Sequence, residues 1–414
     1  MVPERRRAFN ERFTDSRYQT YCAALERQCG RAVEFRLSET PCFLPERLVD
    51  SLVETSDALL HQLLDSPEYL HAANAVVPVE FRVPNGEREP TFVQVDFGLL
   101  ETGAGMEPRL VELQAFPSLY GFQVAMAEAA IGAYDLADVT PFLQGLSREA
   151  YLSLMRRTLV GDHDPAEVVL LEIDPRHQKT WPDFVVTEQL WGVRAVDVRS
   201  VVRDGRRLWY DRDGQRTPIA RVYNRVIPDE LQRKHLELAF DFRDELDLDW
   251  TGGPDWFFRI SKFSLPWLRH PSVPRTQYLS EVTRIPEDRE NWIVKPLFSF
   301  AGGGIIFAPT DAQLAAIATA DRRHYVLQER VAFTPTINTP YGPTQAEIRI
   351  MMVHDGQRDG KPVYRALLPL VRMGRGKMMG VDHNKGLRWV GAAPGLVSAQ
   401  AFQPPSLPAL KPLS

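Results

Sequence analysis

The chain has 414 residues, of which 44% are hydrophobic and 25% charged, and its formal net charge is -5 at pH 7. This composition is that of an ordinary globular protein with two or three lobes, and the dispersed basic residues give no reason to expect a nucleic-acid partner. No apolar run reaches the roughly 18 residues that span a bilayer, and the charged N-terminus is not a secretory signal, so we expect a cytoplasmic protein without a membrane partner. Cys22, Cys29 and Cys42 are odd in number and lack nearby histidines, which favours packing thiols over disulfides or zinc ligands.

In residues 1–75, apolar residues recur at helical spacing, and Ser66-Pro67 predicts the end of a helix. After residue 75 the apolar residues no longer follow the helical spacing. Residues 80–100 predict two strands joined by a turn at Pro84-Asn85-Gly86, the second with one solvated face. Residues 108–122 predict a further strand that runs into a loop, and helical segments follow up to about residue 160.

Three polar residues on these strands are candidate metal ligands. If the strands are antiparallel neighbours, Glu112 and Gln114 point to one face because side chains alternate, and Asp96 can join them there. Oxygen ligands from adjacent strands suit Mg²⁺ that is also held by nucleotide phosphates. The alternative is that each is an ordinary polar residue on a half-exposed strand.

The second half of the chain begins with an α/β pattern. Residues 166–225 predict a strand, a helix and a strand, followed by a hairpin around Asp213-Gly214. Residues 229–250 are charged and predict a helix with a solvated face. Further strands are predicted in three later segments, and the proline-rich tail is expected to be irregular. These strands lie in residues 325–333, 346–356 and 363–373.

The most informative stretch is residues 291–307, NWIVKPLFSFAGGGIIF. It predicts a strand that ends at Lys295, and then a turn at Gly302, Gly303 and Gly304 into a second strand. Glycines let backbone N–H groups form a concave anion site, to which the lysine adds a full positive charge. A tight hairpin uses the same residues, so the stretch alone leaves a phosphate site and a plain hairpin open.

Together, the segments VKPLFSFAGGGI, YVLQERV, AEIRIMMV and VELQAF resemble the ATP-grasp superfamily. The resemblance implies that Lys295 and the glycine loop hold the ATP phosphates, and that Gln328, Glu329 and Val331 form the hinge against adenine. Glu112-Leu113-Gln114 comes almost two hundred residues before the lysine, an order similar to the circularly permuted branch that includes eukaryotic glutathione synthetase and the glutathionylspermidine synthetase-like ligases.

The permuted branch accounts for further residues by resemblance. It implies that Lys262 is a second ATP-contacting lysine. It also implies a substrate pocket near Ser118, Tyr120, Tyr223 and Arg225. Gln114 departs from the family's asparagine, and its carbonyl lies one methylene further out, which leaves the metal geometry open.

Three charged residues late in the chain complete the expected site. The glycine loop lacks the glutamate of glutathione synthetase, and Glu347 would supply this acid. Arg349 shares the face of Glu347 and would contact a phosphoryl group, and Arg372 falls where relatives place a carboxylate-binding arginine. An ordinary cross-strand charge pair is the alternative for Glu347 and Arg349.

The implied fold is of the α+β and α/β class, a circularly permuted ATP-grasp fold with two α+β lobes that enclose the nucleotide and an additional α/β substrate-side domain. We therefore expect a helical N-terminal region, a portion with the metal-binding strands, the α/β substrate-side domain, a nucleotide-binding portion with the glycine lid, and the tail. These are residues 1–75, 76–160, 161–255, 256–402 and 403–414.

The resemblance implies an ATP-dependent carboxylate–amine ligase that forms an acyl phosphate and releases ADP and phosphate. Its cofactors would be ATP and two Mg²⁺ ions, and its partners a small carboxylate and an amine, such as an amino acid or short peptide. Arg349 and Arg372 would be catalytic. Two alternatives stay open: a kinase that stops after phosphoryl transfer, and a noncatalytic nucleotide-binding or scaffold protein. A redox dinucleotide protein is not favoured, because the glycines lead into a strand and not into a helix.

Overall fold

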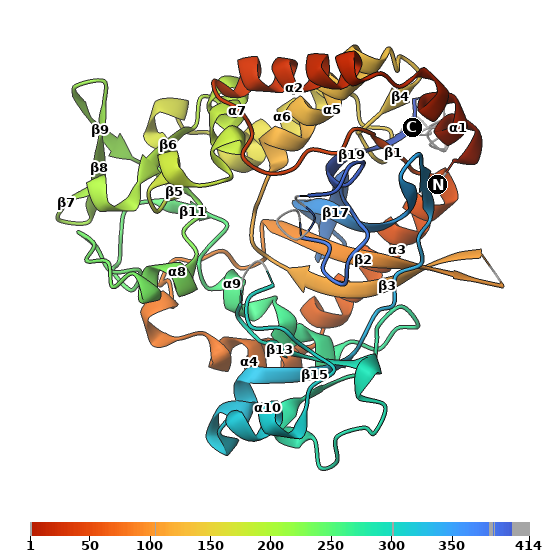
Figure 1. The fold of residues 1–414 in the computed structure, drawn as a ribbon. Helices are drawn as coiled ribbons and strands as arrows, with labels where there is room; N and C mark the ends of the chain where they lie inside the picture. Colours follow the sequence, from red (N-terminus) through yellow and green to blue (C-terminus); the bar gives the residue numbers. More distant parts are fainter. Residues whose placement is uncertain (1, 104, 300–301, 381–383, 385, 400–414) are drawn as a thin grey trace, which may run out of the picture.

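The computed structural model describes residues 2–103, 105–299, 302–380, 384 and 386–399. The described part is a mixed α+β structure with four sheets, which confirms the expected α+β class (Figure 1). The proline-rich tail expected at residues 403–414 lies outside the described residues.

The largest sheet has eight strands and joins distant parts of the chain. Six strands follow the order β1-β19-β18-β17-β2-β3, β16 pairs with β17, and β4 pairs with β19. The long antiparallel pair β2–β3 from the first half therefore lies beside the long pair β17–β18 from the end of the chain (Figure 1). The bounds are β1 Cys42–Phe43, β2 Phe92–Thr102, β3 Gly105–Gln114, β4 Val139–Thr140, β16 Ile337–Thr339, β17 Gly342–Arg358, β18 Lys361–Gly374 and β19 Gly391–Ser398.

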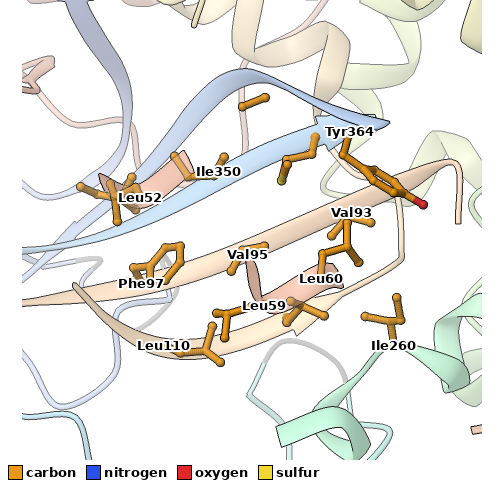
Figure 2. Packing of buried hydrophobic residues seen from close by; sticks show 14 of the residues in the cluster. Leu52, Leu59, Leu60, Val93, Val95, Phe97, Leu110, Ile260, Ile350 and Tyr364 are labelled. Carbon is orange, nitrogen blue, oxygen red and sulfur yellow. The ribbon is translucent and has the colours of Figure 1, made fainter. Parts of the chain in front are cut away.

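Helices cover this sheet, and the helical character expected for residues 1–75 is confirmed. The bounds are α1 Pro3–Arg12, α2 Asp15–Cys29, α3 Glu46–Leu64, α4 Pro67–Val76, α5 Tyr120–Tyr134 and α6 Arg148–Leu159. Helix α3 packs leucines such as Leu59 and Leu60 against Val95 and Phe97 of β2 (Figure 2). Because side chains alternate along a strand, the residues between these, including Asp96, point to the opposite face.

A parallel sheet and a meander form a second region. The parallel strands follow the order β11-β10-β5-β6, and α7 connects β5 to β6, which confirms the predicted α/β pattern. The predicted hairpin at Asp213-Gly214 is also confirmed, as β8 and β9 of a three-stranded sheet. The bounds are β5 Val168–Glu172, α7 Trp181–Trp191, β6 Arg194–Asp197, β7 Val202–Asp204, β8 Arg207–Arg212, β9 Gln215–Ile219, β10 Arg221–Asn224 and β11 Asp249–Thr251.

A four-stranded antiparallel sheet, in the order β12-β15-β13-β14, lies below the large sheet in Figure 1. The pairing of β13 with β14 confirms the predicted strand, turn and strand of residues 291–307. The bounds are α9 Trp256–Arg259, β12 Thr276–Tyr278, β13 Trp292–Pro296, β14 Ile306–Phe307, α10 Asp311–Ala316 and β15 Tyr325–Glu329. Short 3₁₀ helices span Val79–Phe81, Pro165–Glu167, Pro175–His177, Val198–Ser200, Lys262–Trp267, Leu279–Glu281, Arg289–Asn291 and Thr319–His324.

The first strand predicted in residues 80–100 is wrong. This segment instead packs against the parallel-sheet region, with Phe81 against two phenylalanines of the core. The Glu87 carboxylate accepts the N–H groups of Gly252 and Gly253 at 3.0 and 2.7 Å. The expected solvated face of the next strand is also wrong: β2 is buried on both faces, and Asp96 is 1% exposed.

The long helix predicted for residues 229–250 is wrong as well, because α8 covers Pro228–Arg233 alone. Beyond it, aspartate side chains accept local backbone N–H groups: Asp241 from Arg243 at 2.8 Å, and Asp244 from Asp241 at 2.7 Å. Such bonds compete with a helix. Phe240 and Phe242 are then buried in the core.

In the part of the chain that the structure describes, no helix is both long enough and apolar enough to cross a membrane.

Candidate functional site

The face of the large sheet opposite α3 is polar. On it Asp96 pairs in register with Glu112, and Gln94 with Gln114. Arg349 lies opposite Asp96 on the other side of β2. The predicted placement of Asp96, Glu112 and Gln114 on one face of neighbouring antiparallel strands is therefore confirmed. Gln94 is a further member that the same alternation could have identified.

Two arginines enclose Asp96. Arg349 donates from Nε and Nη2 at 2.5 and 2.7 Å, and Arg372 donates from Nη2 at 2.5 Å. Arg372 also forms an ion pair with Glu347. Burial acts to raise the pKa of Asp96, but the two guanidinium groups outweigh it and hold that pKa below its ordinary value.

Side-chain amides extend this network. Gln94 accepts from Arg349 Nη1 at 2.7 Å and donates to the Ser118 carbonyl at 2.9 Å. Gln114 Nε2 donates to Gln94 Oε1 at 2.9 Å. In the opposite orientation of this amide, its oxygen lies 3.1 Å from both Nη atoms of Arg349 and accepts from them. The sequence-predicted Ser118 is thus connected to the Asp96 network through its main chain.

Two lysines approach from separate segments. Lys262, at the start of its 3₁₀ helix, donates to Glu112 Oε1 at 3.0 Å and to the Ser299 carbonyl at 2.8 Å. Lys295, at the end of β13, donates to the Val111 carbonyl at 3.1 Å. Both are nearly fully buried, and burial lowers the pKa of Lys295 to about 8. The structure thus brings both predicted lysines to strand β3.

The glycine loop is described from Gly302 onward. Gly302 and Gly304 have φ angles of 75° and 73°, a left-handed conformation that favours glycine. A Cβ atom at Gly304 would also lie 2.9 Å from Pro296 Cγ. These two glycines are therefore required by the turn itself, and Gly303 lies between them.

The side chains of the predicted hinge residues face in different directions. Gln328 lies on the same face of its sheet as Lys295, is fully buried, and has no hydrogen-bond partner for either amide atom among the described residues. Glu329 lies on the other face and pairs with Arg275 at 3.3 Å. Val331 follows the strand and is half-buried. The Glu329 carboxylate is therefore engaged by Arg275, and the adenine contact of these three residues stays a prediction.

The sequence analysis did not identify Phe333, whose ring lies beside the polar face. A Cβ atom at Gly98 would lie 2.1 Å from Phe333 Cε1, so the ring packs directly on this glycine. Gly98 lies opposite Glu347 and two residues from Asp96 on the polar face. The half-buried ring therefore borders the charged cluster.

The predicted substrate residues lie toward the parallel sheet. Tyr120 donates to the Met352 carbonyl at 2.9 Å, and the Tyr223 ring lies against the Phe92 ring with 5.4 Å between their centroids, so both tyrosines are buried in the core. Arg225 is 2% exposed, donates to the Pro117 carbonyl, and has an Nε without a partner in the described part.

Glu172 and Asn224 accompany Arg225 and were missed. They are the last residues of β5 and β10, the two central strands of the parallel sheet. Strand β6 lies beside β5 on one side, and β11 lies beside β10 on the other. Ligands of open α/β sheets bind at such a switch point. Burial raises the pKa of Glu172 to about 8, against the opposing effect of Arg225, and Asn224 Nδ2 has no partner in the described residues. A carboxylate at the end of a buried strand is the signal that could have pointed to Glu172.

The site suits an anion better than a protein-bound divalent cation. Both Asp96 oxygens are engaged by guanidinium groups, and Glu112 Oε1 is engaged by Lys262. Within the described ranges, no group of three or more His, Cys, Asp or Glu side chains is placed to hold a metal. Asp96 therefore does not fit the magnesium role expected for it, and the two implied Mg²⁺ ions stay predictions.

No protein-family model matches the chain, and no curated protein matches its sequence. Its fold is similar to a solved structure described as a glutathione synthetase-like effector (GSS30) from Globodera pallida in apoform. The TM-score is 0.54 and the identity 14%, over 87% of this chain and 95% of that chain. The likeness supports a glutathione synthetase-like fold.

Proposed function

We propose that the chain binds ATP between the large sheet and the sheet of β13 and β15, and uses it to join a carboxylate to an amine. The observation that carries this proposal is the meeting of Lys262 and Lys295, both buried, on strand β3. A buried ammonium group is costly unless an opposite charge meets it. Lys262 contacts the Glu112 carboxylate, whereas Lys295 contacts a main-chain carbonyl, so a polyphosphate would supply the missing negative charge.

The charge balance of the whole cluster supports an anionic ligand. The cluster has four cationic side chains against three carboxylates, which leaves one positive charge in excess. The cations are Lys262, Lys295, Arg349 and Arg372, and the carboxylates are Asp96, Glu112 and Glu347. Phosphoryl transfer is catalysed mainly by positioning and by neutralising charge on the transferred group, which such a cluster can do.

The nucleotide base would lie along β15. Gln328 presents a buried donor and a buried acceptor, both without partners in the described part, on the face that carries Lys295. A buried amide without partners costs free energy, and the polar edge of a base would satisfy it. The turn at Gly302–Gly304 would cover the phosphates, with the ATP-grasp fold as the corresponding architecture.

The substrate would be amino-acid-like. Arg225 carries a buried positive charge with an unused donor, and Glu172 a buried carboxyl group near it. These groups match a carboxylate and an ammonium of one zwitterion. Both are covered in this arrangement, so binding would require movement of the loop that includes Pro117 and Ser118.

The proposed reaction has two steps. A substrate carboxylate oxygen bonds to the γ-phosphorus of ATP while the bond to the ADP oxygen breaks. The amine nitrogen then bonds to the acyl carbon, phosphate leaves with the bonding electrons, and the amine loses a proton to solvent. A closed glycine turn would keep water from the acyl phosphate.

A second candidate is a nucleotide-binding protein without turnover. One observation favours it: both oxygens of Asp96 are already engaged by Arg349 and Arg372 in a buried network. Such a network stabilises a fixed arrangement and needs no substrate.

Product analysis separates these functions. The protein is incubated with ATP, MgCl₂ and pools of amino acids and short peptides, and ADP is measured with hydroxylamine present as an acyl-phosphate trap. A ligase gives hydroxamate and, with an amine, an amide. A phosphorylated product that needs no amine indicates a kinase, and ATP binding without ADP release in every pool indicates the second candidate. Lys295→Met abolishes ADP release under the proposal, whereas Lys234→Met, at the exposed C-terminal cap of α8, does not.

A further inference from the structure

The feature that the proposed function leaves unexplained is the enclosure of Asp96. The side chain is 1% exposed, and its two oxygens receive three charged hydrogen bonds of 2.5 to 2.7 Å from Arg349 and Arg372. Charge-assisted bonds of this bidentate kind are among the strongest in proteins. A divalent cation at Asp96 would have to displace guanidinium groups that remain next to it.

The two arginines differ in how many of their guanidinium N–H groups have hydrogen-bond partners. Arg372 has a buried Nε without a partner in the described residues, and Glu347 is its second carboxylate neighbour. Arg349 uses Nε and both Nη atoms on Asp96 and Gln94. Arg372 is thus the arginine with a donor to spare, and its side chain is 25% exposed, so a ligand can reach it.

We propose that Asp96 is the counter-ion that holds Arg349 and Arg372 in place for a phosphoryl anion, and that it does not bind a metal. This inference rests on the proposed function, because the same lysines would hold the rest of the polyphosphate. In the absence of a ligand, Asp96 neutralises charge that would otherwise be buried and unpaired. When the anion arrives, it meets Arg372 already oriented by Asp96 on one side and Glu347 on the other.

The two roles of Asp96 predict opposite effects of one substitution. As a metal ligand, Asp96 would be needed for binding of the magnesium complex of ATP, so Asp96→Asn would weaken it. As a counter-ion, Asp96 opposes an anion, so Asp96→Asn removes a repulsion and keeps the shape and one acceptor oxygen. If the charge of Asp96 acts on the anion over about 10 Å through an effective dielectric constant of about 20, removal of this charge corresponds to roughly tenfold tighter anion binding.

The experiment measures the binding of pyrophosphate in EDTA and of ATP in MgCl₂ by calorimetry for the wild type, Asp96→Asn and Glu101→Gln. Glu101 is an exposed carboxylate on the same strand and serves as the matched control. We expect measurable binding by the wild type, roughly tenfold tighter pyrophosphate binding and no weakening of ATP binding for Asp96→Asn, and no change for the control, whose charge is screened by solvent. Weaker binding of ATP in MgCl₂ by folded Asp96→Asn, which a metal ligand predicts, overturns the inference, and so does weaker binding of pyrophosphate in EDTA.

A second measurement covers the case in which Asp96→Asn does not fold. The wild type alone is titrated with pyrophosphate in EDTA and in MgCl₂, with thermal unfolding as the readout. Stabilisation in EDTA supports the counter-ion role, and stabilisation that needs MgCl₂ overturns it. If the wild type binds neither pyrophosphate nor ATP in MgCl₂, the proposed function itself fails, so the two failures are distinguishable.

Discussion

Gly98 shows how a single residue shapes the site. It interrupts the polar series of β2 on the face that carries Gln94 and Asp96, and the Phe333 ring occupies the space that a side chain would fill. The alternation of β2 and β3 allowed the shared face of Asp96, Glu112 and Gln114 to be predicted from sequence. The ring could not be predicted, because a glycine does not indicate which distant residue will cover it.

Gly98→Ala is therefore expected to destabilise the fold. The new methyl group overlaps the Phe333 ring, and overpacking of this kind costs about 1 to 3 kcal/mol. Urea unfolding measures the change. Gly132→Ala, an exposed position of α5 with no atom within 4 Å of an added Cβ, is the control and should gain about 0.5 to 1 kcal/mol from helix propensity. Equal stability of Gly98→Ala and the wild type would show that the ring does not rest on this glycine.

At the scale of elements, strong periodicity was informative and charged composition was not. Strands β15, β17 and β18 were predicted from their apolar patterns, and the hairpin of β8 and β9 from its turn. The helix predicted for residues 229–250 was wrong because aspartates there accept backbone N–H groups in local turns, and α8 does not extend through them. The start of helix α5 could not be predicted from its own residues either. It has no side-chain cap of its own, and Asp183 of α7 provides the cap.

Asp183→Ala should loosen the connection between α5 and α7. The carboxylate accepts the N–H groups of Leu119 and Phe122 at 3.0 and 2.9 Å, and both become unsatisfied in the variant. We expect a loss of about 2 to 3 kcal/mol and faster hydrogen exchange at these two amides. Ser147→Ala removes an exposed local cap of α6 and should cost only about 1 kcal/mol. A smaller loss for Asp183→Ala than for Ser147→Ala contradicts this account.

At the scale of the whole molecule, the kinds of sheet were foreseeable and the contacts between distant segments were not. The α+β class and the parallel-sheet region follow from local patterns. The packing that brings Lys262 and Lys295 onto β3 depends on surfaces from distant segments, which no local pattern encodes. The burial of Glu172 and Asp183 has the same origin.

This burial predicts how stability depends on pH. Burial raises the pKa of Glu172 from 4.5 to about 8 and also raises that of Asp183. Between about pH 5 and 8 the folded chain therefore holds protons that the unfolded chain has released, so stability falls as pH rises through this window. We expect a loss of a few kcal/mol by urea unfolding, and a flatter profile for Glu172→Gln. Glu54→Gln, on the exposed side of α3, is the control. A profile that rises from pH 5 to 8 in the wild type would refute the prediction.

The central claim is that the two buried lysines form a nucleotide site, and thermal unfolding with ATP and MgCl₂ tests it most directly. The wild type, Lys295→Met and Lys234→Met are compared with and without the nucleotide. At about 100 times its dissociation constant, ATP should stabilise the wild type and Lys234→Met by about 2.7 kcal/mol and leave Lys295→Met unchanged. Equal shifts in all three proteins, or none in the wild type, would contradict the claim that Lys295 holds the nucleotide.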